Sequence, residues 1–453
     1  MLHEEPFDLV VRGRLVLSGR EAAPGTIAIR DGRVAAVAER SAALLALREL
    51  DVGEALVLPG VVDSHVHTRS APQEGIETAS RAAAAGGVTT LVDMPYDADA
   101  LVATVAAFEA KVAAVEAEAL VDVALWATVP PIGPLDQVAG LVSAGACGFK
   151  LSTYNTHPRR FPRIDDAQLL RAFAAIAGAG SLAALHSEND EIVRAQIAAE
   201  QADGASDALA HARSRPAVAE TEAIGRVLEL ALATGVSVHL CHVTVGRGVE
   251  LAARAFGDGV DVTAETCPHY LLLDEDDFAR RGGELKINPP LRSAVEVEAL
   301  WDALGSGGLD YVASDHVGWA AERKHGDDIL ALSSGAPGLE LMLPLMHGAM
   351  AARGLGADRL AHALSEAPAR RLGLWPRKGN LLPGADADLV VLDPDAQWVV
   401  DPGKLETACG WSPYTGRTVS GSIRHVFCRG KEIFADGRVL TGPGHGSFVA
   451  SHA

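Results

Sequence analysis

The sequence is poor in several residue types, and each shortage limits what the protein can be. Aromatic residues make up 5% of the 453 positions, and only seven of the 39 basic residues are lysine. Basic residues are outnumbered by acidic ones, which gives a formal net charge of −20. We therefore expect no nucleic acid and no anionic membrane among the partners. No uncharged apolar stretch is long enough to cross a bilayer.

Cysteine is also scarce. The five cysteines are scattered and form no CxxC pair, which is typical of a protein without a disulfide framework in a reducing compartment. The N-terminal segment MLHEEPFDLVV carries acids early and lacks the basic region of a signal peptide. We therefore expect a cytoplasmic protein.

Strand-like and helix-like segments alternate through the middle of the chain. The hydrophobic content of 48% is sufficient for a large core. Between 59 and 376, apolar runs such as TTLVDMP and SVHLCHV are separated by Ala-rich helical segments. This α/β pattern predicts a parallel sheet, and about eight such units predict a (β/α)8 TIM barrel. The two ends, 1–58 and 377–453, consist of short strands with turns and predict one smaller β-sandwich domain composed of both.

Six residues able to bind metals or transfer protons follow apolar runs of strand length. They are His65, His67, Lys150, His186, His242 and Asp315. The active sites of TIM barrels lie at the carboxyl ends of the strands, so we expect these side chains to converge there. His65 and His67 are two residues apart, and on a strand both can reach one cation. Imidazole and carboxylate ligands of this number suit two divalent ions, with zinc the expected metal.

Lys150 is unusual because it lies between Phe149 and Leu151 in an apolar strand. A buried ammonium is costly, and a neutral amine there can react with carbon dioxide to give a carbamate with two oxygens for two metals. Two other interpretations stay open: the side chain reaches solvent, or it pairs with a buried acid. A single histidine at a strand end is more often a core residue, and Asp315 could be a helix N-cap, so only the whole set together indicates a metal site.

The motifs together resemble those of the cyclic amidohydrolases, which include hydantoinases, dihydropyrimidinases, allantoinases and dihydroorotases. The resemblance covers nearly the whole chain and depends on LPGVVDSHVH, AAAAGGVTTLVDMP, GFK, HSEND, CHVT, ETCPHYLLLDEDDF, KINPPLRS, SDH, GAPGLE and KGNLLPGADADLVVLD. It implies a binuclear centre, usually zinc, whose ligands are the six residues above, with Lys150 carboxylated. It further implies that Asp315 is the catalytic acid/base, and that a hydroxide bridging the metals attacks a ring carbonyl. A homodimer or homotetramer is implied as well.

Residues that would contact the substrate give a mixed picture. Arg69 matches the arginine with which dihydroorotases hold a carboxylate, although a structural salt bridge is an equal alternative, and Asn288 is also dihydroorotase-like. The asparagine that dihydroorotases carry after MP is absent, and Tyr96 stands there. Tyr154 lies one residue closer to the lysine than the oxyanion-holding tyrosine of D-hydantoinases. Backbone groups for the ring's imide are expected from Ser334, Gly335 and Ala336.

The favoured function is metal-dependent hydrolysis of a small cyclic amide or ureide, of hydantoinase or allantoinase type. A dihydroorotase is an alternative that requires Arg69 to anchor a carboxylate. A mononuclear barrel deaminase would use the histidines and the aspartate but no lysine ligand, and a scaffold protein would need none of them. Two metal ions per chain and dependence on bicarbonate would separate a binuclear hydrolase from the deaminase. Loss of turnover of an acidic substrate in Arg69→Ala would indicate a dihydroorotase, and turnover that is lost in Lys150→Ala would exclude a scaffold. The sequence leaves open which ring is the substrate, which enantiomer is preferred and which metal is native.

Overall fold

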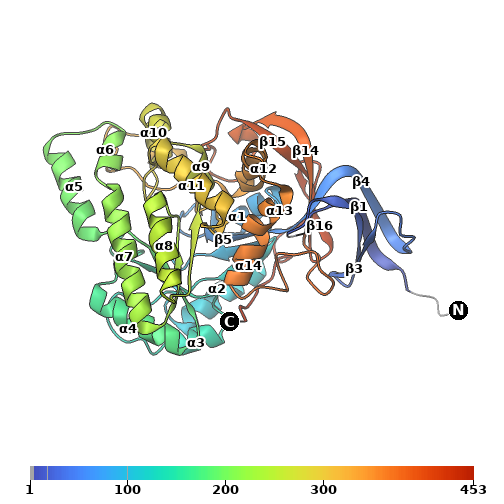
Figure 1. Cartoon of the computed structure of the whole chain (residues 1–453), viewed down its shortest axis with the longest axis horizontal. Coiled ribbons are helices and arrows are strands. Elements are labelled where there is room, and N and C mark those ends of the chain that lie inside the picture. Colours follow the sequence, from blue (N-terminus) through green and yellow to red (C-terminus); the bar gives the residue numbers. More distant parts are fainter. Residues whose placement is uncertain (1–4, 18, 99, 453) are drawn as a thin grey trace.

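The computed structural model describes residues 5–17, 19–98 and 100–452. It contains a barrel surrounded by helices and, beside it, a sheet-rich part in which the blue and red ends of the chain meet (Figure 1). None of the described helices is long and apolar enough to cross a membrane.

The barrel strands are parallel and follow the chain around the axis. They are β5 (Val61–His67), β6 (Val88–Asp93), β7 (Asp122–Leu125), β8 (Phe149–Ser152), β9 (Leu182–His186), β10 (Ser237–Leu240), β11 (Val262–Thr266), β12 (Tyr311–Val312) and β13 (His316–Val317). Between β7 and β8, the backbone N–H groups of Cys147 and Lys150 donate to the carbonyls of Leu125 and Ala127. At the other seam β12 pairs with β11, and β13 pairs with β5. β12 and β13 are separated by three residues and together take the place of the eighth strand, so the arrangement is that of the predicted (β/α)8 barrel.

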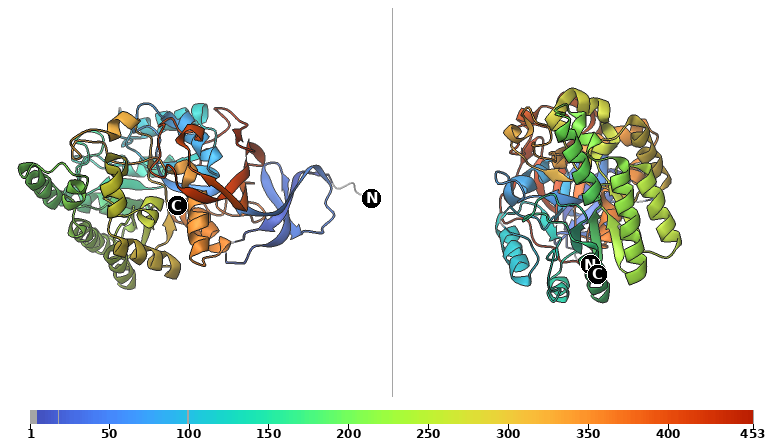
Figure 2. Two further views of the ribbon diagram at one scale, coloured as in Figure 1. Left: turned by 90° about the horizontal axis from the view of Figure 1, so that it is seen from above. Right: turned by 90° about the vertical axis from the view of Figure 1, so that its left-hand side faces the viewer.

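Helices cover the outside of the barrel (Figure 2). They are α1 (Gly75–Ala85), α2 (Val105–Glu118), α3 (Val138–Ser143), α4 (Asp166–Gly178), α5 (Asp190–Ala202), α6 (Leu209–Arg213), α7 (Ala217–Thr234), α8 (Gly246–Gly257), α9 (Pro268–Leu272), α10 (Glu275–Arg281), α11 (Ala294–Ser306), α12 (Met342–Ala352), α13 (Ala357–Ala361) and α14 (Ala367–Arg371). Their ends follow local chemistry. The hydroxyl of Thr104 accepts from the Ala107 N–H at the start of α2, and Gly235, at φ 71°, ends α7 in the left-handed region.

Alternation along each strand separates side chains that face the helices from those that face the barrel axis. In β6, Leu91 packs in the outer core beneath the helices, and Val92 packs in a separate inner cluster. In β8, Phe149 and Leu151 both belong to the outer core. Lys150, between them, therefore points toward the axis, and its side chain is fully buried. It does not reach solvent, which removes one of the open interpretations.

Both ends of the chain form one further sheet. Its strands are β1 (Phe7–Leu15), β2 (Ala23–Arg30), β3 (Arg33–Glu39), β4 (Ala46–Pro59), β14 (Leu389–Val399), β15 (Thr418–Cys428), β16 (Lys431–Ala435) and β17 (Arg438–Val439). The order is β17-β16-β15-β14-β4-β1-β2-β3, so the antiparallel pair of β4 and β14 joins the two ends. The strands are continuous in one hydrogen-bonded sheet, and register shifts in β1 and β14 let it bend around its own core.

Two features connect the sheet-rich part and the barrel. Lys378 is fully buried and ion-pairs with Asp122 of β7 and with Asp388 just before β14. Beyond β17 the chain returns to the barrel, where the Val123 N–H donates to Ser447 and the Val449 N–H donates back to Val123. The domain bounds 1–58 with 377–453, and 59–376, stay a prediction, and the chain's last described residues lie against the barrel.

Candidate metal centre and active site

All six predicted ligands line one pocket at the carboxyl ends of the barrel strands. His65 and His67 come from the end of β5, Lys150 from β8 and His186 from the last position of β9. His242 lies two residues after β10, and Asp315 lies between β12 and β13. His242 and Asp315 have φ values of 39° and 46°. Non-glycine residues rarely adopt this left-handed region, and such strain gathers at functional sites.

Three of the six residues form one group of donor atoms. Asp315 Oδ1 lies 3.2 Å from His65 Nε2 and 3.6 Å from His67 Nε2. Burial would raise the pKa of Asp315, but the two imidazoles outweigh it and hold that pKa at about 2. Burial, followed by the positive charge of Lys150, lowers the pKa of His65 to about 4. At neutral pH the group thus offers a carboxylate and neutral imidazole nitrogen, which suits a divalent cation.

His186 and His242 form a second group. His186 Nδ1 lies 3.0 Å from His242 Nε2, and His186 Nε2 donates to Glu188 at 2.7 Å. Burial lowers the pKa of both histidines, for His242 well below the usual value and with further help from the charge of Lys150. Two neutral imidazoles with their ring nitrogens turned toward each other can share one cation.

Lys150 lies beside both groups. Its Nζ has no hydrogen-bond partner among the described residues and no ion pair with any of them. The second open interpretation, a buried acid as its partner, is therefore unsupported. The Lys150 carbonyl accepts from the hydroxyls of Tyr96 (2.9 Å) and Thr128 (2.7 Å), which fixes this part of β8. A buried, unpartnered amine between these two groups of donor atoms fits a carbamate that would serve a cation at each.

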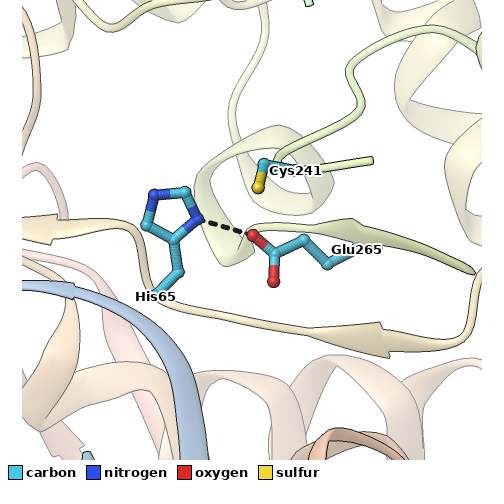
Figure 3. A group of neighbouring side chains, drawn as sticks. All are labelled: His65, Cys241 and Glu265. Atoms are coloured by element: carbon cyan, nitrogen blue, oxygen red, sulfur yellow. Dashed lines mark hydrogen bonds and ion pairs between the residues drawn. The ribbon is translucent and has the colours of Figure 1, made fainter. Parts of the chain in front are cut away.

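Glu265, which we did not predict, fixes the orientation of the His65 ring through its Nδ1 atom. Its Oε1 lies 2.6 Å from His65 Nδ1 (Figure 3), and its Oε2 accepts from Ser64 Oγ at 2.8 Å. The Nδ1–H therefore donates to the carboxylate and leaves Nε2 available as a ligand. Cys241, also drawn in Figure 3, lies close to this pair, but burial raises the pKa of its thiol to about 12. The thiol stays protonated, so Glu265 positions a ligand rather than forming a thiolate site.

Glu188 plays the matching part for His186. Besides accepting from His186 Nε2, it accepts from Arg215 Nη1 at 2.6 Å. Burial opposes its charge, but Arg215 and His186 lower the pKa of Glu188 to about 2. Because Glu188 lies two residues after His186, the sequence could have indicated this contact. No comparable pattern connects Glu265 with His65, since 200 residues separate them along the chain.

Three of the predicted substrate contacts line the pocket, namely Asn288, Ser334 and Gly335. Ala336 is buried and pairs with His316, and it is not among the described residues that line the pocket. Its role, like that of the others, stays a prediction.

Arg69 and Tyr154 are also outside the set of described residues that line the pocket. The Nε of Arg69 lies 3.9 Å from an Asp97 carboxylate oxygen, as expected for the salt-bridge alternative. Tyr154 is buried, and the guanidinium of Arg215 lies 4.3 Å from its ring centre. Tyr154 therefore supports the Glu188–Arg215 pair.

Several pocket residues were not predicted. They are Ser70, Tyr96, Thr156, His157, Arg160, Phe161, Val317 and Trp319. Most lie in the segments that follow β5, β8 and β13, whose course depends on contacts between distant parts of the chain.

Comparison with known proteins identifies the family. The sequence profile described as the amidohydrolase family matches residues 56–433. The chain belongs to the amidohydrolase family. An allantoinase of Rubrobacter xylanophilus is 38% identical over 449 residues, which cover 98% of this chain and 97% of that relative. An L-hydantoinase of Paenarthrobacter aurescens is 35% identical over 451 residues, which cover 98% of each chain.

Solved structures of the family have the same fold. The L-hydantoinase (dihydropyrimidinase) from Arthrobacter aurescens matches with a TM-score of 0.95 at 35% identity, covering 98% of this chain and 100% of that one. A D-hydantoinase matches with a TM-score of 0.92 at 29% identity, covering 98% and 99%. Membership of the amidohydrolase family implies dependence on divalent metal ions, in agreement with the donor atoms described above.

Proposed function

We propose that this amidohydrolase opens the ring of a cyclic ureide, with a reaction of allantoinase or hydantoinase type. The single observation that carries the proposal is the complete set of donors around the unpartnered Nζ of Lys150. Relatives named allantoinase and L-hydantoinase that span almost the whole chain support the choice of a cyclic ureide.

The donor atoms assign the metal positions. His65, His67 and Asp315 would hold one divalent ion, and His186 and His242 would hold a second. Lys150, after its amine has added carbon dioxide and released a proton, would offer one carbamate oxygen to each. Zinc suits these nitrogen and oxygen ligands. When bound, the ions would supply Lewis acidity toward the ring carbonyl and make water more acidic.

Asp315 is the group that moves the proton. Its carboxylate is ionised, lines the pocket and comes from a strand end, so it can accept a proton from the attacking water. In the step, a bond forms between the water oxygen and the ring carbonyl carbon, and the ring C–N bond breaks. Asp315 returns the proton to the departing ring nitrogen, which gives an open N-carbamoyl product.

The ring would be held by groups that are already fixed. Asn288 Oδ1 is buried, lines the pocket and has no hydrogen-bond partner among the described residues, so it is available to accept from a ring N–H. In the adjacent loop, the Ser334 carbonyl accepts from Trp319 Nε1 at 2.8 Å, and the Gly335 N–H donates to the Lys286 carbonyl at 2.9 Å. These bonds set the loop before substrate arrives.

The test is ring opening by protein loaded with zinc and bicarbonate. Allantoin, 5-substituted hydantoins of both hands, dihydrouracil and dihydroorotate form the substrate panel, and metal content is measured on the same samples. We expect about two metal ions per chain and turnover of a ureide ring. The Lys150→Ala variant should lose both the bound metal ions and the turnover. Two bound metals with no ring opened would overturn the proposed substrate class, and full activity in Lys150→Ala would overturn the assigned centre.

We also propose that the chain forms a homodimer or homotetramer. Large apolar side chains on its surface support this, including Leu47 at 75% exposure and Ile132 at 77%. Light scattering after size-exclusion chromatography tests it, and a monomeric mass would contradict it.

A further inference from the structure

The mouth of the active-site pocket carries positive charge in a protein whose formal net charge is −20. Arg160 lines the pocket, and Arg323 lies over the face of Trp319, 4.6 Å from its ring centre. The Arg160 guanidinium lies 5.8 Å from the centre of the same ring. Among the described residues that line the pocket, Asp315 is the one acid, and it lies with the metal ligands. The mouth therefore offers cationic donors without a carboxylate to balance them.

Arg160 is held in place by the segment between β8 and α4. His157 and Phe161 pair through two backbone hydrogen bonds, and His157 Nδ1 accepts from the Arg160 N–H at 3.1 Å. The Arg160 side chain donates from Nη1 to the Ser70 carbonyl at 3.0 Å. Phe161 stacks on Tyr96 with ring centres 3.7 Å apart, which fixes the adjoining wall. The guanidinium is thus placed by backbone and side-chain contacts on both sides.

Most of the hydrogen-bonding capacity of Arg160 is unused. A guanidinium has five N–H donors, and within the described residues the Ser70 bond is the one hydrogen bond that this side chain makes, with no ion pair. The side chain is half-buried, so water satisfies its donors only in part. A partly desolvated, oriented and unpaired guanidinium is a site for a planar oxygen acceptor.

On the basis of the proposed function, we propose that Arg160 binds an oxygen acceptor on the ring's exocyclic substituent. The substituent is a ureido carbonyl or a carboxylate, groups that share the planar acceptor geometry a guanidinium recognises. Trp319 forms the flat surface beside which this group lies. Arg160, rather than Arg69 with its Asp97 partner, is therefore the specificity-determining arginine of this pocket.

The test compares three 5-substituted hydantoins that differ in the substituent alone. Allantoin carries a ureido group, 5-carboxymethylhydantoin carries a carboxylate, and 5-isobutylhydantoin carries neither. In Arg160→Met we expect kcat/KM to fall about 10- to 100-fold for the first two, mainly through KM, and to change less than about twofold for the third. Arg159→Met is the matched control, because Arg159 is an exposed neighbour in the same segment and is not among the residues lining the pocket.

A fall in kcat/KM confined to 5-carboxymethylhydantoin shows that Arg160 recognises charge. A fall for both allantoin and 5-carboxymethylhydantoin shows that Arg160 recognises the acceptor oxygen, and either result supports the inference. An equal loss on all three rings, or no loss on any, overturns it. Arg160→Lys is the second variant should Arg160→Met unfold, and it should retain part of the preference for the carboxylate. Calorimetric binding of the three compounds separates this inference from the proposed function. If wild type opens no ring but still binds the polar compounds through Arg160, the proposed reaction fails and the subsite stands.

Discussion

Glu265 provides a sharp test of the proposed metal centre, because it contacts the proposed ligand His65 and is not itself a proposed ligand. Its two oxygens accept from His65 Nδ1 at 2.6 Å and Ser64 Oγ at 2.8 Å, and His239 Nε2 lies 3.2 Å away. Burial opposes the charge of Glu265, but His65 and His239 hold its pKa well below the usual range. In Glu265→Gln the size is unchanged, but one accepting oxygen becomes a donating amide.

The expected loss follows from these contacts. One amide oxygen cannot serve all three donors, so either His65 loses the bond that fixes its ring or another buried donor is left unsatisfied, which costs about 1–3 kcal/mol. Loss of a partner of this kind weakens metal binding about 10- to 100-fold, which corresponds to about 1.4–2.8 kcal/mol. Competition with a chromophoric chelator, starting from metal-free protein, measures the dissociation constant directly.

Glu340→Gln is the matched control for this experiment. Glu340 is a carboxyl group with little exposure that lines a different cavity, against β14 and β15. The same chemical change there should leave metal affinity within about twofold of wild type. If Glu265→Gln also binds metal as tightly as wild type, the positioning role argued for Glu265 is refuted.

Three further predictions concern stability. Lys378→Met leaves Asp388 buried without its cation and leaves Asp122 with Arg429 alone, and should cost about 3–5 kcal/mol in denaturant unfolding; a loss below about 1 kcal/mol would contradict this expectation. Burial raises the pKa of Glu340 from 4.5 to about 8, so the folded state holds its proton more tightly. Wild type should then lose about 4 kcal/mol of stability relative to Glu340→Gln as pH rises from 4.5 to 8, and parallel melting curves would disprove it. Chelation should abolish turnover and lower Tm by the equivalent of about 3 kcal/mol for a site loaded at a hundredfold excess over Kd, and zinc should restore both.

The sequence was sufficient to predict the barrel and the convergence of the six ligands, because both depend on regular spacing. Lys150 between Phe149 and Leu151 had to face opposite to its neighbours once β8 packed its apolar side under the helices. His65 and His67 likewise share one face of β5. Residues at the carboxyl ends of parallel strands lie together whatever their separation along the chain.

The rest depends on contacts that spacing does not encode. No pattern connects Glu265 with His65 or predicts that Asp97 would lie near Arg69. The predicted role of Tyr154 in the pocket depended on its distance from the lysine, but the buried Arg215 lies against its ring. Arg160 could not be distinguished from its exposed neighbour Arg159, because the difference arises only when the segment after β8 closes over the pocket.

The return of the chain's end to the barrel has a consequence for the order of events during synthesis. The bonds between Val123 and the segment around Ser447 and Val449 complete β7 with residues that are synthesised long after β7 itself. Val449 also packs in the inner cluster of the barrel. The barrel therefore cannot finish its hydrogen bonding until this segment has left the ribosome, and a tag inserted next to the segment needs a linker that leaves it free to dock.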